Sequence, residues 1–346
     1  MAKLRVTRKD VSLAAGVSTA TVSNVLNNKG NVSDDVRRRV LEIIGQLDYK
    51  PNMIARSLIT NKTYQVAIVL DDITDPHHSA IVDAFQREAA AAGYFVNVNI
   101  RDRNLRALFD SLISRGIEGT FLMVSPDKYP EEQDTMQNIE YLSTSGVKVV
   151  NGFSSPDSLG KFSSIQLDFG DAVKQAIQYL ASLGHREIGL LSIFPADYPY
   201  DERHRVFIKV MREMMGCDNP SVIYGERPFP GHFDTGEQYT MRLLKQNPNM
   251  TAIIGTNDMT AIGCVSYLVN NGYRIPEDIS VIAIGDVNIT KYFRPALSAM
   301  AINHTEYGRE AFRMLLRSIE SSSTHISQLK LNLVERQTVG YCKQRV

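Results

Sequence analysis

The 346-residue sequence predicts two structural parts: a small all-α unit at its start and a larger α/β core with doubly wound parallel sheets in two lobes. Three observations support this fold class. Short amphipathic helical patterns fill residues 6–47. From residue 66 onward, short apolar strands alternate with helices, which is typical of parallel sheets. After residue 162 the alternation begins again, so a second lobe is expected to repeat the first.

The first part has the pattern of a helix-turn-helix. Apolar residues at helical spacing lie on both sides of Gly16-Val17-Ser18, which indicates two short helices joined by a tight turn. We expect Ser18 to cap the second helix, which would suit the major groove of DNA. The side chains expected on the outer side of this helix are Thr19, Ala20, Ser23 and Asn24.

A third helix is expected at residues 34–47. Ser33 is expected to cap it, and two aspartates follow at the end where the helix dipole is positive. Its apolar residues recur at helical spacing, which predicts one buried stripe. The stripe consists of Val36, Val40, Ile43 and Leu47.

The net charge of zero conceals an asymmetry between the two parts. Residues 1–62 contain eleven Lys and Arg against five Asp and Glu, so they carry +6 and the remainder carries −6. Many charged surfaces are simply solvated. Here the positive charge coincides with the helix-turn-helix, and we therefore expect it to contact the phosphates of nucleic acid.

Residues 51–62 form the predicted linker between the two parts. Pro51 disfavours helix at Lys50, and Asn52 is a suitable cap for a short helix at residues 53–59. Seven residues are too few to remain helical alone in water. On one interpretation their apolar side chains pack on the core, namely Ile54, Leu58 and Ile59.

The core, residues 63–346, is predicted to hold two sets of strands and helices. The first set has strands at 66–70, 95–100, 119–124 and 147–153 and helices at 79–92, 105–115 and 133–145. The second has strands at 163–167, 188–193, 252–255 and 281–285 and helices at 171–183, 203–215, 236–246 and 260–270. The lobes are expected to comprise about 63–162 with 293–322 and about 163–292 with 323–346, after a headpiece at 1–50 and the linker at 51–62.

Motifs in both parts carry a resemblance to a known family. In the first part they are Asp10-Val11, Ala15-Gly16-Val17-Ser18, Thr21-Val22-Ser23, Val25-Leu26-Asn27 and Ala55-Arg56-Ser57-Leu58. In the core they include Gly184-His185-Arg186-Glu187-Ile188-Gly189, Asn257-Asp258-Met259-Thr260 and Ile275-Pro276-Glu277-Asp278. These residues resemble the LacI/GalR family of bacterial repressors over essentially the whole chain. The resemblance implies a DNA-binding headpiece and a core with the two-lobed fold of periplasmic sugar-binding proteins.

The resemblance further implies a cytoplasmic homodimer that represses transcription at a palindromic operator in double-stranded DNA. In that family the hinge helix forms when two subunits lie side by side on DNA. Leu58 stands where a leucine of the family enters the minor groove, and apolar wedges are a known way to kink DNA. The DNA-binding residues are then Thr7, Ser18, Thr19, Ala20, Thr21, Ser23, Asn24, Asn27, Lys29, Tyr49, Asn52, Ala55, Arg56 and Leu58.

The resemblance also implies a small-molecule effector, a sugar or sugar derivative, in the cleft between the lobes. A carboxylate, a guanidinium and an amide that face one cleft can pair with vicinal hydroxyls. The alternative is that Asp168 merely caps a helix and that Arg203 pairs with a neighbouring acid. The effector-binding residues are then His77, His78, Ser125, Asp168, Arg203, Phe233, Asn257 and Asp286.

The sequence departs from the family pattern at two places in this cleft. Gly285 stands where the family usually has an acid that contacts the sugar, and Pro76-His77-His78 stands where relatives often have Pro-Phe-Phe. Loss of a carboxylate and of an aromatic surface argues against a typical neutral hexose. A phosphorylated or anionic effector, or a phosphorylated protein corepressor, is then an alternative.

Other functions are less well supported by the sequence. Asp71, Asp75, His77 and His78 are close together, but no second Cys or His cluster completes a metal site, and no cofactor is expected. The chain lacks the glycine-rich nucleotide-binding fingerprints, so we do not expect an enzyme. Three cysteines at unrelated spacings fit free thiols in a reducing cytoplasm. Without a signal peptide or an apolar run near the roughly 18 residues of a membrane span, neither a membrane protein nor an exported binding protein without a DNA role is expected.

Overall fold

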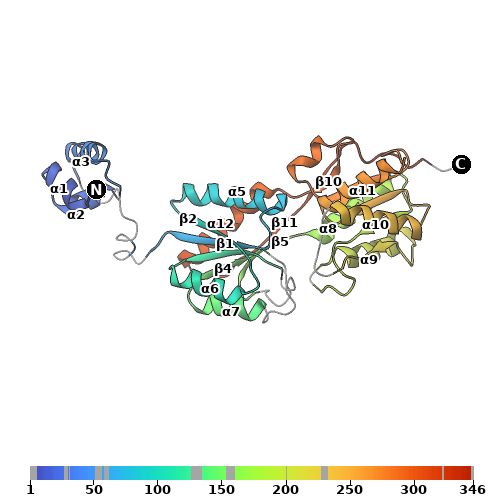
Figure 1. Cartoon of the computed structure of the whole chain (residues 1–346), viewed down its shortest axis with the longest axis horizontal. Coiled ribbons are helices and arrows are strands. Elements are labelled where there is room, and N and C mark those ends of the chain that lie inside the picture. The colour runs from blue at the N-terminus through green and yellow to red at the C-terminus, as the bar shows by residue number, and fades with distance from the viewer. Residues whose placement is uncertain are drawn as a thin grey trace. The chain divides into compact units, whose positions relative to one another are not determined.

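The computed structural model describes residues 6–26, 30, 32–50, 57, 62–125, 135–152, 160–199, 201–226, 233–321 and 323–343. The chain forms two compact units, Met1–Tyr64 and Gln65–Val346. Figure 1 shows a first unit made of helices and a second unit made of two lobes, each a sheet flanked by helices. The predicted linker helix at 53–59 lies, except for Ser57, outside the described residues.

The first unit contains the three predicted helices, α1 (Arg8–Ala15), α2 (Thr19–Leu26) and α3 (Asp34–Gln46). Thr7 caps α1 through a reciprocal capping box with Asp10, and Gly16 ends the helix in the left-handed conformation at φ 64°. The Ser18 hydroxyl accepts the Thr21 amide at 3.0 Å, as predicted for the cap of α2. Ser33 precedes α3 but makes no capping bond with its side chain, contrary to expectation.

A small apolar core holds these helices together. The predicted stripe of α3 packs there, with Val40 fully buried and its neighbours partly buried. Three helices are enough to bury one face each, and the remaining surface stays polar. The buried residues of this core are Val11, Ala15, Val22, Val25, Val40 and Tyr49.

The first lobe is built on a parallel sheet with the strand order β11-β5-β4-β3-β1-β2. Its strands are β1 (Gln65–Leu70), β2 (Phe95–Ile100), β3 (Gly119–Met123), β4 (Lys148–Asn151), β5 (Ser163–Leu167) and β11 (Ile326–Leu329). Helices α5 (Pro76–Ala91) and α12 (His304–Ser321) pack together on one face. Helices α6 (Leu105–Ser114) and α7 (Thr135–Thr144) pack together on the other. Every residue of β1 after Gln65 is buried, as expected for a strand covered on both faces.

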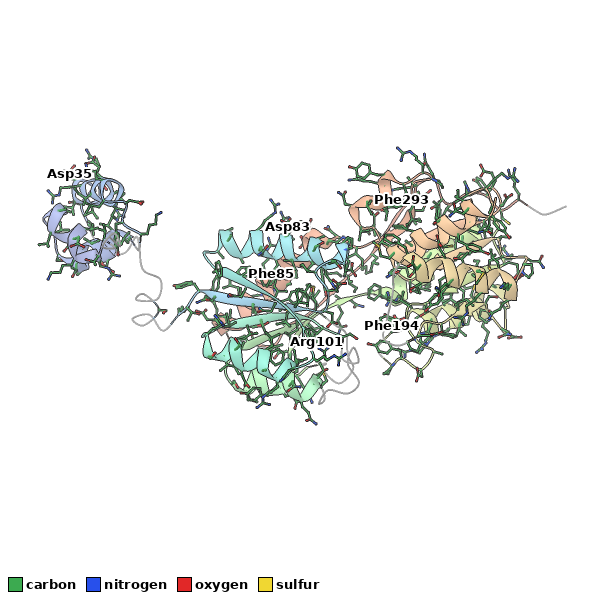
Figure 2. The ribbon with its side chains drawn as sticks, in the orientation of Figure 1. Asp35, Asp83, Phe85, Arg101, Phe194 and Phe293 are labelled. Atoms are coloured by element: carbon green, nitrogen blue, oxygen red, sulfur yellow. The ribbon has the colours of Figure 1, made fainter. Side chains whose placement is uncertain are left out.

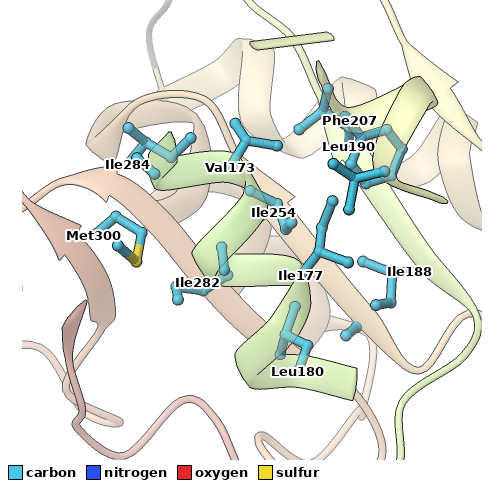
Figure 3. Packing of buried hydrophobic residues seen from close by; sticks show 14 of the residues in the cluster. Val173, Ile177, Leu180, Ile188, Leu190, Phe207, Ile254, Ile282, Ile284 and Met300 are labelled. Atoms are coloured by element: carbon cyan, nitrogen blue, oxygen red, sulfur yellow. The ribbon is translucent and has the colours of Figure 1, made fainter. Parts of the chain in front are cut away.

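The second lobe repeats this scheme with the strand order β12-β10-β9-β8-β6-β7. Its strands are β6 (Ile188–Leu191), β7 (Val222–Ile223), β8 (Ala252–Gly255), β9 (Ser280–Gly285), β10 (Ser298–Ala301) and β12 (Asn332–Val334), the last antiparallel to β10. Helices α8 (Phe169–Ser182) and α9 (Arg203–Met215) cover one face, and α10 (Phe233–Gln246) and α11 (Asp258–Asn270) the other. Figure 3 shows α8 residues such as Val173 and Ile177 packed against Ile254 and Ile282 of the sheet.

The chain passes between the lobes from β5 to α8, from β10 to α12 and from β11 to β12. The expected lobe boundaries therefore need correction. Residues 163–167 were expected in the second lobe but pair with β4 and β11 of the first. Residues 326–329, also expected in the second lobe, form β11 and pair with β5 in the first sheet. Conversely, β10 joins the second sheet although residues 293–322 were expected in the first lobe. Apolar strands of either sheet have the same pattern, so the pattern alone does not tell which sheet a crossing strand joins.

Within the described parts of the chain, none of the helices combines the length and apolar character that crossing a bilayer requires. The longest of them, α12, spans His304–Ser321 and alternates buried apolar residues with exposed charged ones. It packs on the first sheet by its apolar face.

Candidate functional site

A cavity of about 260 Å³ lies between the two sheets of the second unit. Its lining comes from the carboxyl ends of β1, β3, β4 and β5 in the first lobe and of β6, β8 and β9 in the second. Ligands of open α/β sheets gather at this end, because the loops there diverge from a rigid frame. Figure 2 shows Arg101 and Phe194 on the facing sides of the two lobes.

Five of the predicted effector-binding residues line this cavity. They are contributed by α5, the end of β3, α9 and the start of α11, so distant segments converge as the family resemblance implied. The five are His77, His78, Ser125, Arg203 and Asn257.

The other three predicted residues do not line the cavity. Asp168 caps α8 by accepting the Asp171 amide at 3.0 Å, which is the alternative considered for it. Asp286 points to Arg336, with 2.6 Å between Oδ1 and Nη1. Phe233 begins α10 and is 46% exposed, outside the cavity lining. The ion pair of Asp286 and the exposed position of Phe233 are not revealed by their places in the sequence.

Arg203 is a buried cation held by protein groups on two sides. Its Nε donates to Asp201 at 2.6 Å and its Nη1 donates to the Thr256 carbonyl at 2.8 Å. The guanidinium also lies 4.4 Å from the centre of the Phe169 ring. The pairing with Asp201 was the structural alternative for this residue, and in the structure it coexists with a place on the cavity wall.

Two histidines meet beside the cavity. His77 Nδ1 lies 2.9 Å from His304 Nε2, so one ring donates an N–H and the other accepts it. Burial, together with the nearby His78, His304 and Arg203, holds the pKa of His77 well below its usual value. Burial likewise lowers the pKa of His304, against the opposing effect of Asp286 and Asp75. Both rings are therefore neutral at pH 7.

Asp258, at the start of α11, is a cavity residue that the sequence did not single out. It is 5% exposed, and its Oδ1 accepts the Asp286 amide at 2.8 Å. Burial raises its pKa to about 7, partly offset by the backbone amides of Asp286 and Val287. Its neighbour Asn257 was predicted from the family resemblance, and the position at a strand end cannot tell which of two adjacent residues faces a cleft.

The carboxyl of Asp258 occupies the space above Gly285. A Cβ at position 285 would lie 2.5 Å from Asp258 Cγ and closer still to Oδ2. An alanine there would force the buried carboxyl to move and to lose the amide it accepts. The glycine that departs from the family pattern therefore makes room for a different acid.

Polar contacts also join the two lobes beside the cavity. The hydroxyls of Ser125 and Tyr198 lie 3.2 Å apart, one at the end of β3 and the other after β6. The Ser125 amide donates to Asp71 at 2.7 Å, and Arg101 donates to the Ser125 carbonyl at 2.6 Å. Arg101 is 3% exposed and lies 3.8 Å from Asp71, so this carboxylate of the cavity wall has its own cation.

Aromatic rings supply the apolar part of the wall. Phe194 stacks on Tyr198 with 4.5 Å between ring centres and an angle of 6°. Phe169 and Tyr307 also line the cavity. Relatives often have two phenylalanines where this chain has His77-His78, and here other elements supply the aromatic rings. These rings offer an apolar surface for the face of a sugar or of another ring.

In the first unit, α2 presents a polar surface. Thr19, Ala20 and Asn24 are exposed, and Val22 and Val25 are buried behind them, as the pattern predicted. Thr7 and Ser18 are exposed beside it, whereas Ser23 and Thr21 are partly buried.

The other predicted DNA-binding residues differ in their placement. Tyr49 is 7% exposed and packs in the core of the first unit, so it is not a surface residue as expected. The remaining predicted residues lie outside those that the structure describes, namely Asn27, Lys29, Asn52, Ala55, Arg56 and Leu58.

No group of His, Cys, Asp and Glu among the described residues is arranged to hold a metal ion. The histidines at the cavity bond to each other or, for His78, to the Asp72 carbonyl at 2.8 Å. The described side chains of this site offer hydrogen-bonding groups and aromatic rings.

Known proteins match both units. Residues 7–52 match the model of bacterial regulatory proteins of the lacI family, and residues 177–339 match a periplasmic binding protein-like domain. A transcriptional repressor named PurR from Mannheimia succiniciproducens is 29% identical over 96% of this chain and 98% of its own length. The repressor CytR of Escherichia coli is 28% identical over 91% of this chain and 90% of its own.

A solved structure shows the same fold. The lac repressor dimer bound to operator and an anti-inducer has a TM-score of 0.80 and 23% identity, and the match covers 97% of this chain and 99% of that one. A helix-turn-helix unit followed by a two-lobed core with a cavity at the strand ends defines a DNA-binding regulator with a ligand-binding domain. The chain thus carries a DNA-binding domain of the lacI family at residues 7–52 and a periplasmic binding protein-like domain at residues 177–339, and the relatives that it matches are named transcriptional repressors.

Proposed function

We propose that this protein is a transcriptional repressor that binds a palindromic operator as a homodimer and responds to a small polar effector, a sugar or sugar derivative, in the interlobe cavity. The observation that carries the proposal is that one chain contains both an exposed polar helix, α2, and a cavity at the carboxyl ends of two parallel sheets. A regulator needs both a surface that reads DNA and a site that senses a ligand.

The α2 surface supports the DNA-binding part of the proposal. Thr19 and Ala20 are short side chains suited to thymine methyl groups or to water-mediated contacts. Asn24 is exposed and offers the amide that pairs with adenine N6 and N7. Two copies of such a helix read a site with two-fold symmetry.

An exposed apolar edge supports the dimer. Strand β2 is the edge strand of the first sheet, and Phe95, Val98 and Ile100 are 66%, 37% and 47% exposed. An edge of this kind is normally covered, because its free backbone groups and apolar side chains favour association. We infer that a second copy of the chain covers it.

The cavity supports a polar effector of about the size of a monosaccharide. Arg203 and Asn257 offer donors, Asp71 and Asp75 offer acceptors, and rings close the apolar sides. Such a mixture of convergent polar groups and rings is typical of sites for small polar ligands. Arg203, although paired with Asp201, keeps its place on the wall.

The direct test is a gel shift with the full chain and the promoter regions of its own neighbouring genes, with and without candidate effectors. We expect retardation of a near-palindromic fragment and a change of its affinity with one ligand. Binding to no fragment at low salt, or turnover of the ligand in the cavity, would refute the proposal.

A phosphorylated protein corepressor is the alternative to a small effector. A phosphate group needs arginines that are free to receive it. Arginines do follow one another along α12, but Arg309 and Arg313 pair with Glu88, and Arg317 pairs with Glu310. The charges of this surface therefore favour the small-molecule effector.

A further inference from the structure

The cations around the cavity are already matched by carboxylates. Arg203 pairs with Asp201 at 2.6 Å, and Arg101 lies 3.8 Å from Asp71. Arg336 pairs with Asp286 behind the wall. Because burial keeps His77 and His304 neutral, they add no positive charge.

Two acids of the cavity wall form no ion pair with any cation that the structure describes. Asp75 caps α5 by accepting the His77 amide at 2.8 Å and makes no ion pair with the described part of the chain. Within the part of the chain that the structure describes, Asp258 accepts the backbone amides of Asp286 and Val287, and Asp286 and Asp75 oppose its ionisation. The two acids come from different lobes, Asp75 from the first and Asp258 from the second. A phosphate dianion in this cavity would meet both of them, and the described cations nearby are already paired.

We propose that Asp258 is the residue that recognises the effector, in place of an acid at position 285, and that its ligand is a neutral or cationic small molecule with a hydroxyl or amino donor. The inference stands on the cavity, on the burial of Asp258 and on its occupation of the space above Gly285. It rests on the proposed function, because it names the ligand chemistry of the same cavity.

The consequence for ligand choice follows from charge. An ionised Asp258 accepts a hydroxyl or ammonium donor strongly, since charge-assisted hydrogen bonds are about twice as strong as neutral ones. A ligand that carries a donor stabilises the ionised form, and a ligand that carries an anion disfavours it. The cavity therefore selects against phosphorylated forms of a compound that it binds.

A double-mutant cycle in the full chain tests the placement of Asp258. Gly285→Ala should lower the Tm by roughly 2–6 °C in the wild-type background, because the carboxyl must move. In an Asp258→Ala background the same change should cost less, and the remaining cost is the backbone strain of an alanine at φ 157°. Gly189→Ala is the matched control, since its Cβ would meet Leu243 and its cost should be equal in both backgrounds. Equal losses for Gly285→Ala in both backgrounds would overturn the placement.

Calorimetry with three related probes tests the ligand class: glucose, glucosamine and glucose 6-phosphate. The full chain should bind glucose or glucosamine, and glucose 6-phosphate at least roughly tenfold more weakly. Asp258→Asn should lower the affinity for the sugar roughly tenfold to a hundredfold, because one hydrogen bond to a charged group is lost. Asp234→Asn, which removes an exposed carboxylate from the first turn of α10, should change nothing.

Tighter binding of the phosphate, or an unchanged affinity in Asp258→Asn, would contradict the proposal. Failure of all three probes to bind would overturn the ligand class, and the thermal cycle would still decide the placement of Asp258. Operator binding by the same preparations is measured separately. The proposed function fails if the gel shift fails or if the ligand is turned over, so its failure can be told apart from that of the ligand class.

Discussion

His77 Nδ1 lies 2.9 Å from His304 Nε2, and the two residues belong to α5 and α12, the helices that cover the same face of the first sheet. Burial lowers the pKa of both rings, so folding favours their neutral forms. A depressed folded-state pKa contributes stability above the unfolded value of 6.5, and that stability is lost as the pH falls through the folded value.

The first prediction is that acid destabilises the protein through this pair. Between pH 7.5 and pH 5 the wild type should lose more Tm than His77→Asn, which cannot be protonated. The measurement is thermal unfolding by circular dichroism in matched buffers. His325→Asn is the control, because His325 is only partly buried and its ring bonds to the hydroxyl of Ser323 and not to another histidine. A wild type and His77→Asn with parallel pH profiles would disprove the role of the pair.

The second prediction concerns Asp258 and has the opposite sign. Its pKa rises from 3.8 to about 7 on folding, so its contribution is fully present below pH 3.8 and disappears as the pH rises through 7. Relative to Asp258→Asn, the wild type should lose at most roughly 4 kcal/mol of unfolding free energy between those limits. Urea titrations at pH 5 and pH 8 measure this difference. A constant difference between the two proteins would show that Asp258 ionises normally.

The third prediction addresses base recognition. Asn24→Ala should relax the preference at one position of each operator half-site, at a cost of roughly 1–3 kcal/mol. Lys9 is an exposed cation on α1, and Lys9→Ala should instead weaken the binding of all DNA sequences alike. Binding-site selection from a random library separates the two effects. An Asn24→Ala protein that selects the unchanged site would remove Asn24 from the reading surface.

The fourth prediction concerns assembly. Phe95→Asp places a charge on the exposed edge strand β2 and should weaken the dimer by roughly 2 kcal/mol, with a matching loss of operator affinity. Met214→Asp on α9 is the control, since Met214 is 47% exposed on the other lobe. Sedimentation velocity at several concentrations measures the dimer. If the two variants sediment alike, β2 is not the interface.

Much of the site was predictable because strand ends of a parallel sheet meet at one edge. Arg203, at the start of a helix, and Asn257, at the end of a strand, were predicted from the family resemblance, and both line the cavity. Asp258 was not, because only the packing shows that its carboxyl fills the space above Gly285. Contacts between residues distant in sequence leave no local pattern.

The fold was predicted to a similar extent, and the prediction was wrong for some strands for a related reason. The alternation of strands and helices predicted the two sheets, but β5 and β10 belong to the lobes opposite to those expected. The same apolar strand fits either sheet, and only the crossing connections decide. Tyr49 was misplaced because an aromatic residue after a helix suits either a DNA surface or a core, and here it closes the core.

Strand β1 runs from the start of the second unit to the cavity wall. It begins at Gln65, directly after the first unit and linker, and ends beside Asp71 on the cavity wall. Its six residues span about 20 Å and are hydrogen-bonded on both sides to β2 and β3. A strand held in this way cannot stretch, so a shift of its cavity end displaces its other end by a comparable distance. On the proposed function, transmission through this backbone requires no chain of side chains between ligand and DNA, and substitution of a fully buried β1 residue such as Ile68 is expected to uncouple the two without touching either.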